Sequence, residues 1–240
     1  MFSDSMVNIS SRLIDAVVAA KKAGDAILEV YGSDFSFEWK EDRSPLTLAD
    51  MRSHDVIASQ LNSRKSGKLP VLSEEGSDIH YEERKAWEYY WLIDPLDGTK
   101  EFIKRNGEFT VNIALMHRDR PLMGVIFVPV KDIFYFAFEG AGAFKLSGTS
   151  ALSSRLSFEE LKGVAVRLPL ITATRAGTFT AIASRSHMSR ETSSFLDGLK
   201  KEHGGIEIVS AGSSLKFCLV AEGVADIYPR FGPTMEWDLR

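Results

Sequence analysis

The stretch from Trp87 to Phe102 limits how this chain can fold more than any other part of the sequence. Its aromatic and apolar beginning, residues 87–93, predicts a buried strand. Pro95 is expected to end that strand because proline has no backbone N–H for a sheet ladder. Gly98 followed by Thr-Lys-Glu-Phe predicts the start of a helix. Asp94 and Asp97 therefore lie between the end of a strand and the beginning of a helix.

This junction offers two kinds of chemistry. Its carboxylates and the backbone carbonyl of Leu96 are the oxygen ligands that hard divalent cations prefer. The amides of Gly98 and Thr99 are expected to point outward from the helix N-terminus, where phosphate oxygens bind. A metal ion beside a phosphate is what metal-assisted phosphate hydrolysis requires. The alternative is purely structural: Asp97 caps the helix and Asp94 only ends the strand.

Two more acidic residues are candidates for the same site. Thr47 and Asp50 are three residues apart at the predicted start of a second helix, which is close to a capping box. Asp50 therefore either caps its own helix or faces Thr99 and accepts the proton of that hydroxyl. Glu74 follows a short predicted strand. It is either solvated or one member of a multi-carboxylate metal site.

Composition narrows the class of protein. Of the 240 residues, 44% are hydrophobic and 26% charged, as in ordinary globular proteins, and the net charge of -4 gives no reason to expect a nucleic acid polymer as partner. The single cysteine, Cys218, excludes an internal disulfide and has apolar neighbours typical of a small buried hydrophobe. We find neither a membrane-spanning stretch nor a secretory signal. We expect a cytoplasmic protein without stable membrane insertion, either free or peripheral to the inner face of the cell membrane. The oligomeric state is not predicted.

The remaining periodicity predicts two lobes, an N-terminal α+β lobe at residues 1–150 and a C-terminal α/β lobe at 151–240, with a hinge at 147–155. The first lobe is expected to contain a helix at 7–31, a second helix that opens within 44–50 and runs to about residue 64, an edge strand at 35–40 and an antiparallel meander at 109–116, 121–129, 133–139 and 143–146. The second alternates strands at 179–183, 206–209 and 225–228 with helices at 190–201 and 213–222. Such alternation predicts βαβ units and a partly parallel sheet.

Three widely spaced motifs carry a family resemblance: Ser73-Glu74-Glu75, Asp94-Pro95-Leu96-Asp97-Gly98-Thr99 and Glu236-Trp237-Asp238. In combination they resemble the inositol monophosphatase superfamily of Mg²⁺-dependent, lithium-sensitive phosphatases, over nearly all of the chain. The resemblance implies an α+β, layered αβαβα fold, in which an antiparallel-sheet lobe precedes a smaller mixed or parallel one. Thr-Lys-Glu-Phe after Gly98, together with residues 212–218 and 228–233, is similar to the 3′(2′),5′-bisphosphate nucleotidases of the CysQ group. Inositol monophosphatases tend to have Thr-Asn-Phe after that glycine.

The resemblance implies hydrolysis of adenosine 3′,5′-bisphosphate to AMP and phosphate, a reaction of sulfur assimilation. It implies Mg²⁺ as the cofactor, two or three ions per site, with Mn²⁺ as a substitute. The implied catalytic residues are Asp50, Thr99 and Glu74, and the implied metal ligands are Glu74, Asp94, the Leu96 carbonyl, Asp97 and Asp238. Substrate contacts are expected from Gly98, Thr99, Ser213, Lys216, Arg230 and, as a weaker match, His187. Lys216 and Arg230 would pair with the distal phosphate; the alternative is that both are solvated cations.

The end of the sequence departs from the family pattern. Leu239 follows Asp238 where the family has threonine, and the family usually continues with a further helix and strand. We therefore expect a shortened second lobe and an activity that a full C-terminal segment would raise. Two other functions stay open on the sequence: an inositol or sugar monophosphate phosphatase, and a degenerate homologue that binds phosphorylated ligands without turnover.

Overall fold

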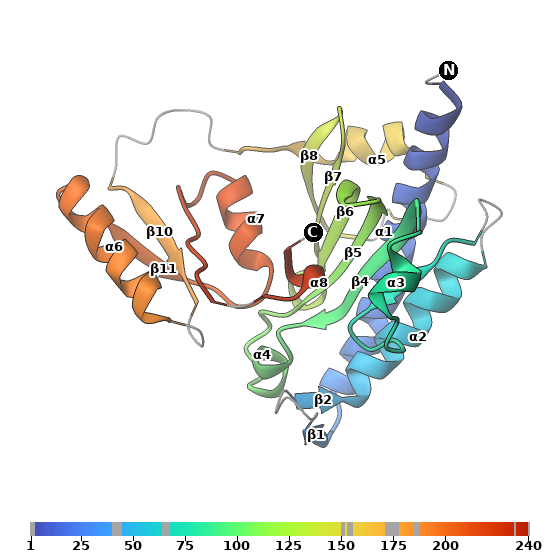
Figure 1. The fold of residues 1–240 in the computed structure, drawn as a ribbon, viewed down its shortest axis with the longest axis horizontal. Helices are drawn as coiled ribbons and strands as arrows, with labels where there is room; N and C mark the ends of the chain where they lie inside the picture. Colours follow the sequence, from blue (N-terminus) through green and yellow to red (C-terminus); the bar gives the residue numbers. More distant parts are fainter. Residues whose placement is uncertain are drawn as a thin grey trace.

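The described residues form alternating layers of helices and sheets. The computed structural model describes residues 3–39, 45–63, 68–149, 152, 156–170, 178–184, 188–232 and 234–239. Helices, a large sheet, helices, a small sheet and a helix follow one another across the molecule (Figure 1). This is the layered αβαβα arrangement, so the expected fold class is confirmed.

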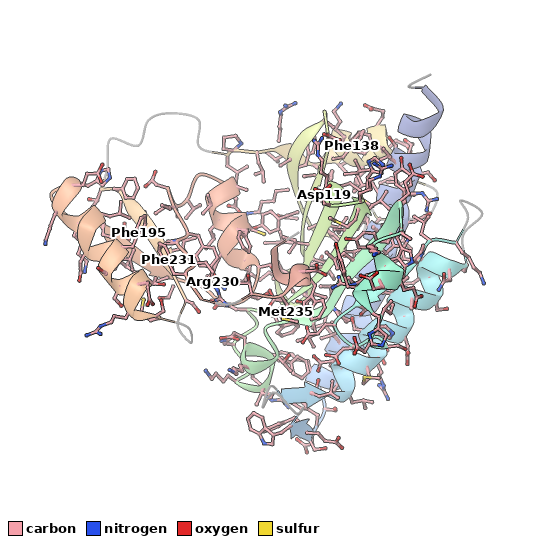
Figure 2. The ribbon with its side chains drawn as sticks, viewed as in Figure 1. Asp119, Phe138, Phe195, Arg230, Phe231 and Met235 are labelled. Atoms are coloured by element: carbon pink, nitrogen blue, oxygen red, sulfur yellow. The ribbon has the colours of Figure 1, made fainter. Side chains whose placement is uncertain are left out.

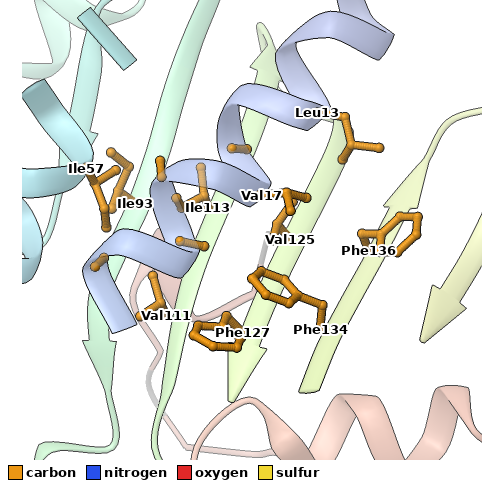
Figure 3. Packing of buried hydrophobic residues seen from close by; sticks show 14 of the residues in the cluster. Leu13, Val17, Ile57, Ile93, Val111, Ile113, Val125, Phe127, Phe134 and Phe136 are labelled. Atoms are coloured by element: carbon orange, nitrogen blue, oxygen red, sulfur yellow. The ribbon is translucent and has the colours of Figure 1, made fainter. Parts of the chain in front are cut away.

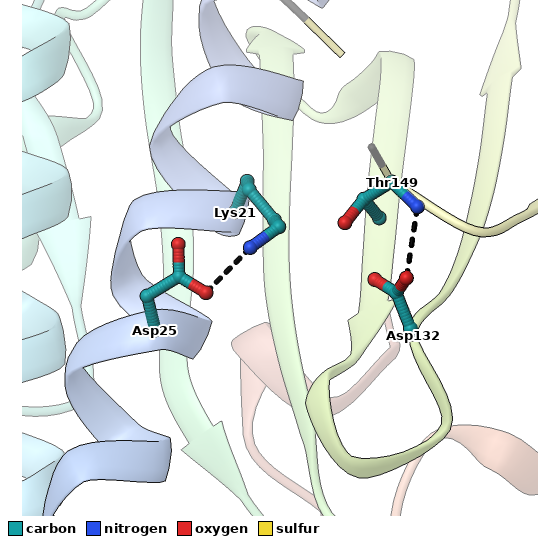
Figure 4. A network of polar contacts seen from close by, with 4 residues as sticks. All are labelled: Lys21, Asp25, Asp132 and Thr149. Atoms are coloured by element: carbon teal, nitrogen blue, oxygen red, sulfur yellow. Dashed lines mark hydrogen bonds and ion pairs between the residues drawn. The ribbon is translucent and has the colours of Figure 1, made fainter. Parts of the chain in front are cut away.

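The outer helical layer consists of α1 (Ser3–Tyr31) and α2 (Leu48–Asn62). The apolar stripe of α1 is buried against the large sheet, where Leu13 and Val17 face the aromatic side chains of the sheet (Figure 3). Gly24 brings the helix close to this sheet, because a Cβ at this position would lie 2.3 Å from Phe127 Cε1. On the same helix, Lys21 forms an ion pair with Asp25 (Figure 4).

The large sheet has seven strands in the order β3-β4-β5-β6-β7-β8-β9. β3 (Val71–Ser73) is parallel to β4 (Tyr89–Asp97), and every other neighbour is antiparallel. The predicted meander corresponds to β5 (Thr110–His117), β6 (Arg120–Val128), β7 (Ile133–Phe138) and β8 (Gly142–Ser147), and is confirmed. The last strand of the sheet is the short β9 (Val166–Arg167). The short elements around the sheet are β1 (Phe37–Trp39), β2 (Pro45–Thr47), α3 (Tyr81–Arg84), the 3-10 helix η1 (Pro129–Lys131) and α5 (Phe158–Val164).

The expected end of the central strand at Pro95 is wrong, because β4 continues to Asp97. The strand accommodates the proline through a bulge. Asp94 pairs with Asn112 and Asp97 with Thr110, so that β4 contains one residue more than β5 over the same step. The missing N–H of proline therefore falls where the ladder is already interrupted.

After β8 the chain passes Asp132, a residue of the β6–β7 turn whose backbone has a left-handed φ of 52°. The backbone N–H of Thr149 donates to Asp132 Oδ2 over 2.8 Å, which ties the end of β8 to the β6–β7 turn (Figure 4). The predicted hinge at residues 147–155 lies partly outside the described residues. The boundary at 150 stays a prediction, and α5 and β9, which follow it, lie with the large sheet.

The second lobe is built on a small parallel sheet of β10 (Thr180–Ala183) and β11 (Glu207–Ser210), covered by α6 (Arg190–Glu202). Ile227 adds a parallel bridge to Ala181, so the alternating pattern predicted for this region is confirmed. Phe195 of α6 contacts Phe231 of the last extended segment (Figure 2).

Helix α7 (Leu215–Ala221) lies between the two sheets (Figure 1). Its Leu215 and Cys218 pack on Val128 and Tyr135 of the large sheet, which joins the lobes through an apolar cluster. The short α8 (Glu236–Leu239) lies on the same side of the large sheet as α7 (Figure 1). Within the described ranges, no helix has both the length and the apolar character that crossing a membrane would need.

Candidate active site

Asp50 lies at the start of α2 and is 2% exposed. Its Oδ2 accepts hydrogen bonds from the backbone N–H and the hydroxyl of Thr47, at 2.7 and 2.6 Å, and the Thr47 hydroxyl accepts one from the N–H of Ala49. This capping box satisfies backbone groups of the first turn. The other oxygen, Oδ1, accepts a hydrogen bond of 3.3 Å from the hydroxyl of Thr99. One carboxylate thus serves both roles considered for it: one oxygen caps the helix and the other faces Thr99.

Asp94 is buried at the bulge of β4, with 2% exposure. The peptide after it is held from α2, because the Ser53 hydroxyl donates to the Pro95 carbonyl over 2.7 Å. The Leu96 carbonyl is 3.5 Å from the hydroxyl of Thr99, at the limit of hydrogen bonding. The bulge therefore presents a carboxylate and a carbonyl oxygen to the same region as Thr99.

Glu74 reaches this region through the parallel pairing of β3 with β4. Ser73 lies opposite Ile93 in the register, and the N–H of Glu74 donates to the Ile93 carbonyl over 3.2 Å. Because the two strands are parallel, Glu74 comes directly after Ser73 just as Asp94 comes directly after Ile93. The two acidic residues are therefore at neighbouring positions of the sheet. His54 supports the strand end from α2, since its Nδ1 is 2.8 Å from the Ser73 hydroxyl.

Gly98 connects β4 to α4 (Thr99–Ile103) with a left-handed φ of 91°. Such a φ strains residues that carry a Cβ. Space for a side chain is also tight, because a Cβ on Gly98 would lie 3.1 Å from Ser213 Cβ. The glycine that precedes the predicted helix is therefore needed for two reasons, its backbone angle and the close approach of the second lobe.

Asp97 is held from the second lobe. The hydroxyls of Ser213 and Ser214 both donate to Asp97 Oδ2 over 2.7 Å. Ser213 has a φ of 55°, which is unusual for a residue with a side chain and turns its hydroxyl toward the first lobe. The structure thus brings together Asp97 and Ser213, which were predicted as a metal ligand and a substrate contact.

Two residues that sequence reasoning missed complete this contact. Thr110 and Asn112, both on β5, are 0% and 7% exposed. The Thr110 hydroxyl is 2.7 Å from the Ser213 hydroxyl and donates to Asn112 Oδ1 over 2.8 Å, while Asn112 Nδ2 donates to Ser214 Oγ over 2.9 Å. The available signal was a pair of polar residues two apart in an otherwise apolar strand, which places both on one face.

The turn that carries the two serines is tightly packed against the first lobe. The N–H of Gly212 donates to Glu108 Oε2 over 2.9 Å. A Cβ on Gly212 would lie 2.6 Å from Glu101 Cγ and 2.9 Å from the Glu108 carbonyl oxygen. Since that carbonyl belongs to the backbone, a side chain here would move the turn.

Lys216 is 7% exposed, so the alternative of a solvated cation is wrong for it. Its Nζ donates to the Ser213 carbonyl over 2.5 Å and lies 5.4 Å from the centre of the Tyr228 ring. Arg230 is half-buried in the segment after that tyrosine, close to Phe231 (Figure 2). The structure therefore places Lys216 beside Ser213. The phosphate contacts of Lys216 and Arg230 stay predictions.

His187 lies outside the described residues, as does the side chain of Asp238. Within the described ranges, no group of three or more histidine, cysteine, aspartate or glutamate residues is gathered so as to hold a metal ion. The carboxylate and carbonyl donors at the β4 bulge are chemically suited to a hard cation. Their assembly into one metal site stays a prediction.

Next to the site, a cavity of about 310 Å³ lies between part of α7 and the large sheet. Its lining is mainly apolar and includes Tyr135, Phe217 and Cys218, with Asn112 and Ser214 also on its wall. Burial raises the pKa of the Cys218 thiol well above its usual range. The cysteine is thus a buried residue among apolar neighbours, as predicted.

Comparison with known proteins agrees with this architecture. The family model described as the inositol monophosphatase family matches residues 10–239, so the chain belongs to that family. Within it, the chain is similar to a protein from Salmonella typhimurium named 3′(2′),5′-bisphosphate nucleotidase CysQ, with 44% identity over 221 residues, 91% of this chain and 80% of the relative. The nucleotidase of the same name from Buchnera aphidicola is 39% identical over 99% of this chain and 82% of its own length.

Solved structures give the same assignment. The crystal structure of CysQ from Bacteroides thetaiotaomicron superposes with a TM-score of 0.84 at 50% identity, over 95% of this chain and 83% of that chain. An inositol monophosphatase from Thermotoga maritima superposes with a TM-score of 0.69 at 20% identity, over 95% and 78% of the two chains, which shows a common fold alone. The predicted resemblance to the CysQ group of this family is confirmed.

Proposed function

We propose that the protein is a Mg²⁺-dependent 3′(2′),5′-bisphosphate nucleotidase that hydrolyses adenosine 3′,5′-bisphosphate to AMP and phosphate. The observation that carries the proposal is the pair of contacts at the end of β4, where Asp50 Oδ1 faces the Thr99 hydroxyl and two serines of the second lobe hold Asp97. The similarity to CysQ nucleotidases supports the substrate class.

The residues around Thr99 explain how an attacking water is prepared. The Thr99 hydroxyl donates its hydrogen to Asp50 Oδ1, so its oxygen lone pairs are left to accept a hydrogen from water. A hydrogen bond to an ionised carboxylate makes the hydroxyl a better acceptor. Thr99 thereby orients the water, and Asp50 stabilises the charge that develops as the proton moves.

The acidic residues would hold the metal cofactor next to Thr99 and the attacking water. Glu74, Asp94, the Leu96 carbonyl, Asp97 and Asp238 are the expected ligands. Mg²⁺, when bound, supplies charge neutralisation and a water of lowered pKa. The amides of Gly98 and Thr99 would bind the scissile phosphate, and Lys216 and Arg230 would pair with the distal one. His187 would contribute a further substrate contact.

Phosphate release decides between this function and its alternatives. Adenosine 3′,5′-bisphosphate, its 5′-phosphosulfate analogue and inositol phosphate should be compared with Mg²⁺, with and without Li⁺. We expect rapid release from the adenosine bisphosphate, inhibited by Li⁺. Faster release from inositol phosphate would instead assign an inositol or sugar monophosphatase, and tight nucleotide binding without Mg²⁺-dependent release would assign a non-catalytic binding protein.

Asp94→Asn is the sharpest variant for this proposal. The exchange preserves side-chain size and removes one negative charge from the bulge. We expect turnover to vanish while the circular dichroism spectrum and Tm stay close to those of the wild type. A variant with near-normal turnover would contradict the assignment of Asp94 as a metal ligand.

A further inference from the structure

The hydroxyls that hold Asp97 belong to a ring of polar groups that lie within hydrogen-bonding distance of their neighbours. The ring runs from Asp97 through Ser213, Thr110, Asn112 and Ser214 back to Asp97, with heavy-atom distances between 2.7 and 2.9 Å. Thr110 and Asn112 belong to the strand that pairs with β4, whereas the serines come from the second lobe. The ring therefore fixes Asp97 against both lobes at once.

The ring also determines which carboxylate oxygen of Asp97 faces a bound cation. Both serine hydroxyls end on Oδ2, so Oδ1 is the oxygen of this carboxylate that is left for a metal ion. Asn112 orients the Ser214 hydroxyl toward Asp97, because its amide nitrogen donates to Oγ and leaves that hydroxyl's own hydrogen for the carboxylate. Thr110 has a single hydroxyl hydrogen and two neighbours, Asn112 Oδ1 at 2.8 Å and Ser213 Oγ at 2.7 Å. Given to Asn112, this hydrogen orients the amide toward Ser214; given to Ser213, it orients that hydroxyl toward Asp97.

We propose that Thr110 and Asn112 are positioning residues, which act through the hydroxyls of Ser213 and Ser214 to hold Asp97 in the orientation that binds the metal cofactor. The inference rests on the proposed function, and it assigns a role to two residues outside the proposed sets of metal ligands and substrate contacts. Partners that orient a metal ligand contribute strongly to metal affinity, and their loss typically weakens binding by about 10- to 100-fold.

The test is metal binding without nucleotide. Mn²⁺ is titrated into metal-free protein, and the free ion is measured by electron paramagnetic resonance. Thr110→Val and Asn112→Leu replace buried polar groups by apolar groups of similar shape. We expect each to weaken Mn²⁺ binding by about 10-fold or more. Thr110→Ser restores the hydroxyl and should bind Mn²⁺ like the wild type.

Thr180→Val is the matched control for stability. Thr180 is 2% exposed on β10, and its hydroxyl donates to the Thr178 carbonyl, far in the chain from the ring. This variant should lose thermal stability with unchanged Mn²⁺ affinity. The proposal is overturned if Thr110→Val and Asn112→Leu bind Mn²⁺ as the wild type does, if Thr110→Ser is as weak as Thr110→Val, or if Thr180→Val is weakened equally.

Failure of the proposed function would look different. A wild-type protein that binds Mn²⁺ but releases no phosphate from adenosine 3′,5′-bisphosphate would refute the nucleotidase activity and still allow the ring to be tested. Absence of Mn²⁺ binding by the wild type would overturn the inference about the ring.

Discussion

The two oxygens of Asp50 can be tested separately, because the structure gives each a different partner. Asp50→Asn retains one carbonyl oxygen, which can continue to accept from the Thr47 N–H, while the amide group then faces Thr99. Thr47→Ala has the converse effect: it removes the hydroxyl that bonds Asp50 Oδ2 and the Ala49 N–H, and it leaves Asp50 Oδ1 beside Thr99. The first variant should affect catalysis, and the second should affect stability.

The expected magnitudes differ enough to be measured. Loss of a threonine N-cap costs about 1 kcal/mol. For a domain of this size such a loss lowers Tm by about 2–4 °C. Asp50→Asn keeps most of the cap and loses the favourable interaction of a negative charge with the helix N-terminus, about 0.3–1 kcal/mol. Removing a group that assists proton transfer should reduce turnover by about 100-fold or more.

Thermal unfolding followed by circular dichroism, together with phosphate release from adenosine 3′,5′-bisphosphate, measures both effects on the same samples. We expect Thr47→Ala to unfold at lower temperature with nearly normal turnover. We expect Asp50→Asn to lose turnover by about 100-fold or more, with a decrease in Tm no larger than that of Thr47→Ala. If Asp50→Asn keeps near-normal turnover, or if Thr47→Ala loses activity to the same extent, the two oxygens do not have separate roles and the reasoning is refuted.

Other predictions address packing, specificity and chemistry. Gly24→Ala places a methyl group against Phe127 and should cost about 1–3 kcal/mol of stability, measured by urea unfolding, with turnover unchanged. Arg230→Lys removes a bidentate donor and should raise KM for the adenosine bisphosphate without affecting inositol phosphate; an equal effect on both would contradict its role. Metal chelation should abolish phosphate release, and added Mg²⁺ should restore it. Burial raises the pKa of Cys218, so a thiol reagent should react slowly until urea unfolds the protein; rapid reaction of the folded protein would contradict this.

Local patterns in the sequence predict much of the first lobe correctly. The alternation and turn residues after residue 103 define the meander, and the Thr47–Asp50 spacing defines the cap of α2, because both depend on neighbours in sequence. The strand through Pro95 was not predictable in this way. Its bulge depends on the partner strand β5, and local propensity carries no information about pairing register.

The site shows the same division between local and distant causes. Gly98 and Thr99 are recognisable from their position after a strand. Lys216 is buried, and the serines donate hydrogen bonds to Asp97, because the second lobe packs against the first. Local sequence patterns do not predict this packing. Thr110 and Asn112 were overlooked because the role of an isolated polar residue in a buried strand depends on its hydrogen-bond partners, which the sequence does not identify.

The separation of 116 residues between Asp97 and Ser213 has a consequence for how the protein matures. During synthesis the large sheet can form before the turn with Ser213 and Ser214 is made. A nascent chain that has completed its meander therefore has Asp97 without the two hydroxyls that hold it. The protein therefore becomes active late, when the final quarter of the polypeptide packs against the large sheet. Chains released before that point should be partly folded but inactive.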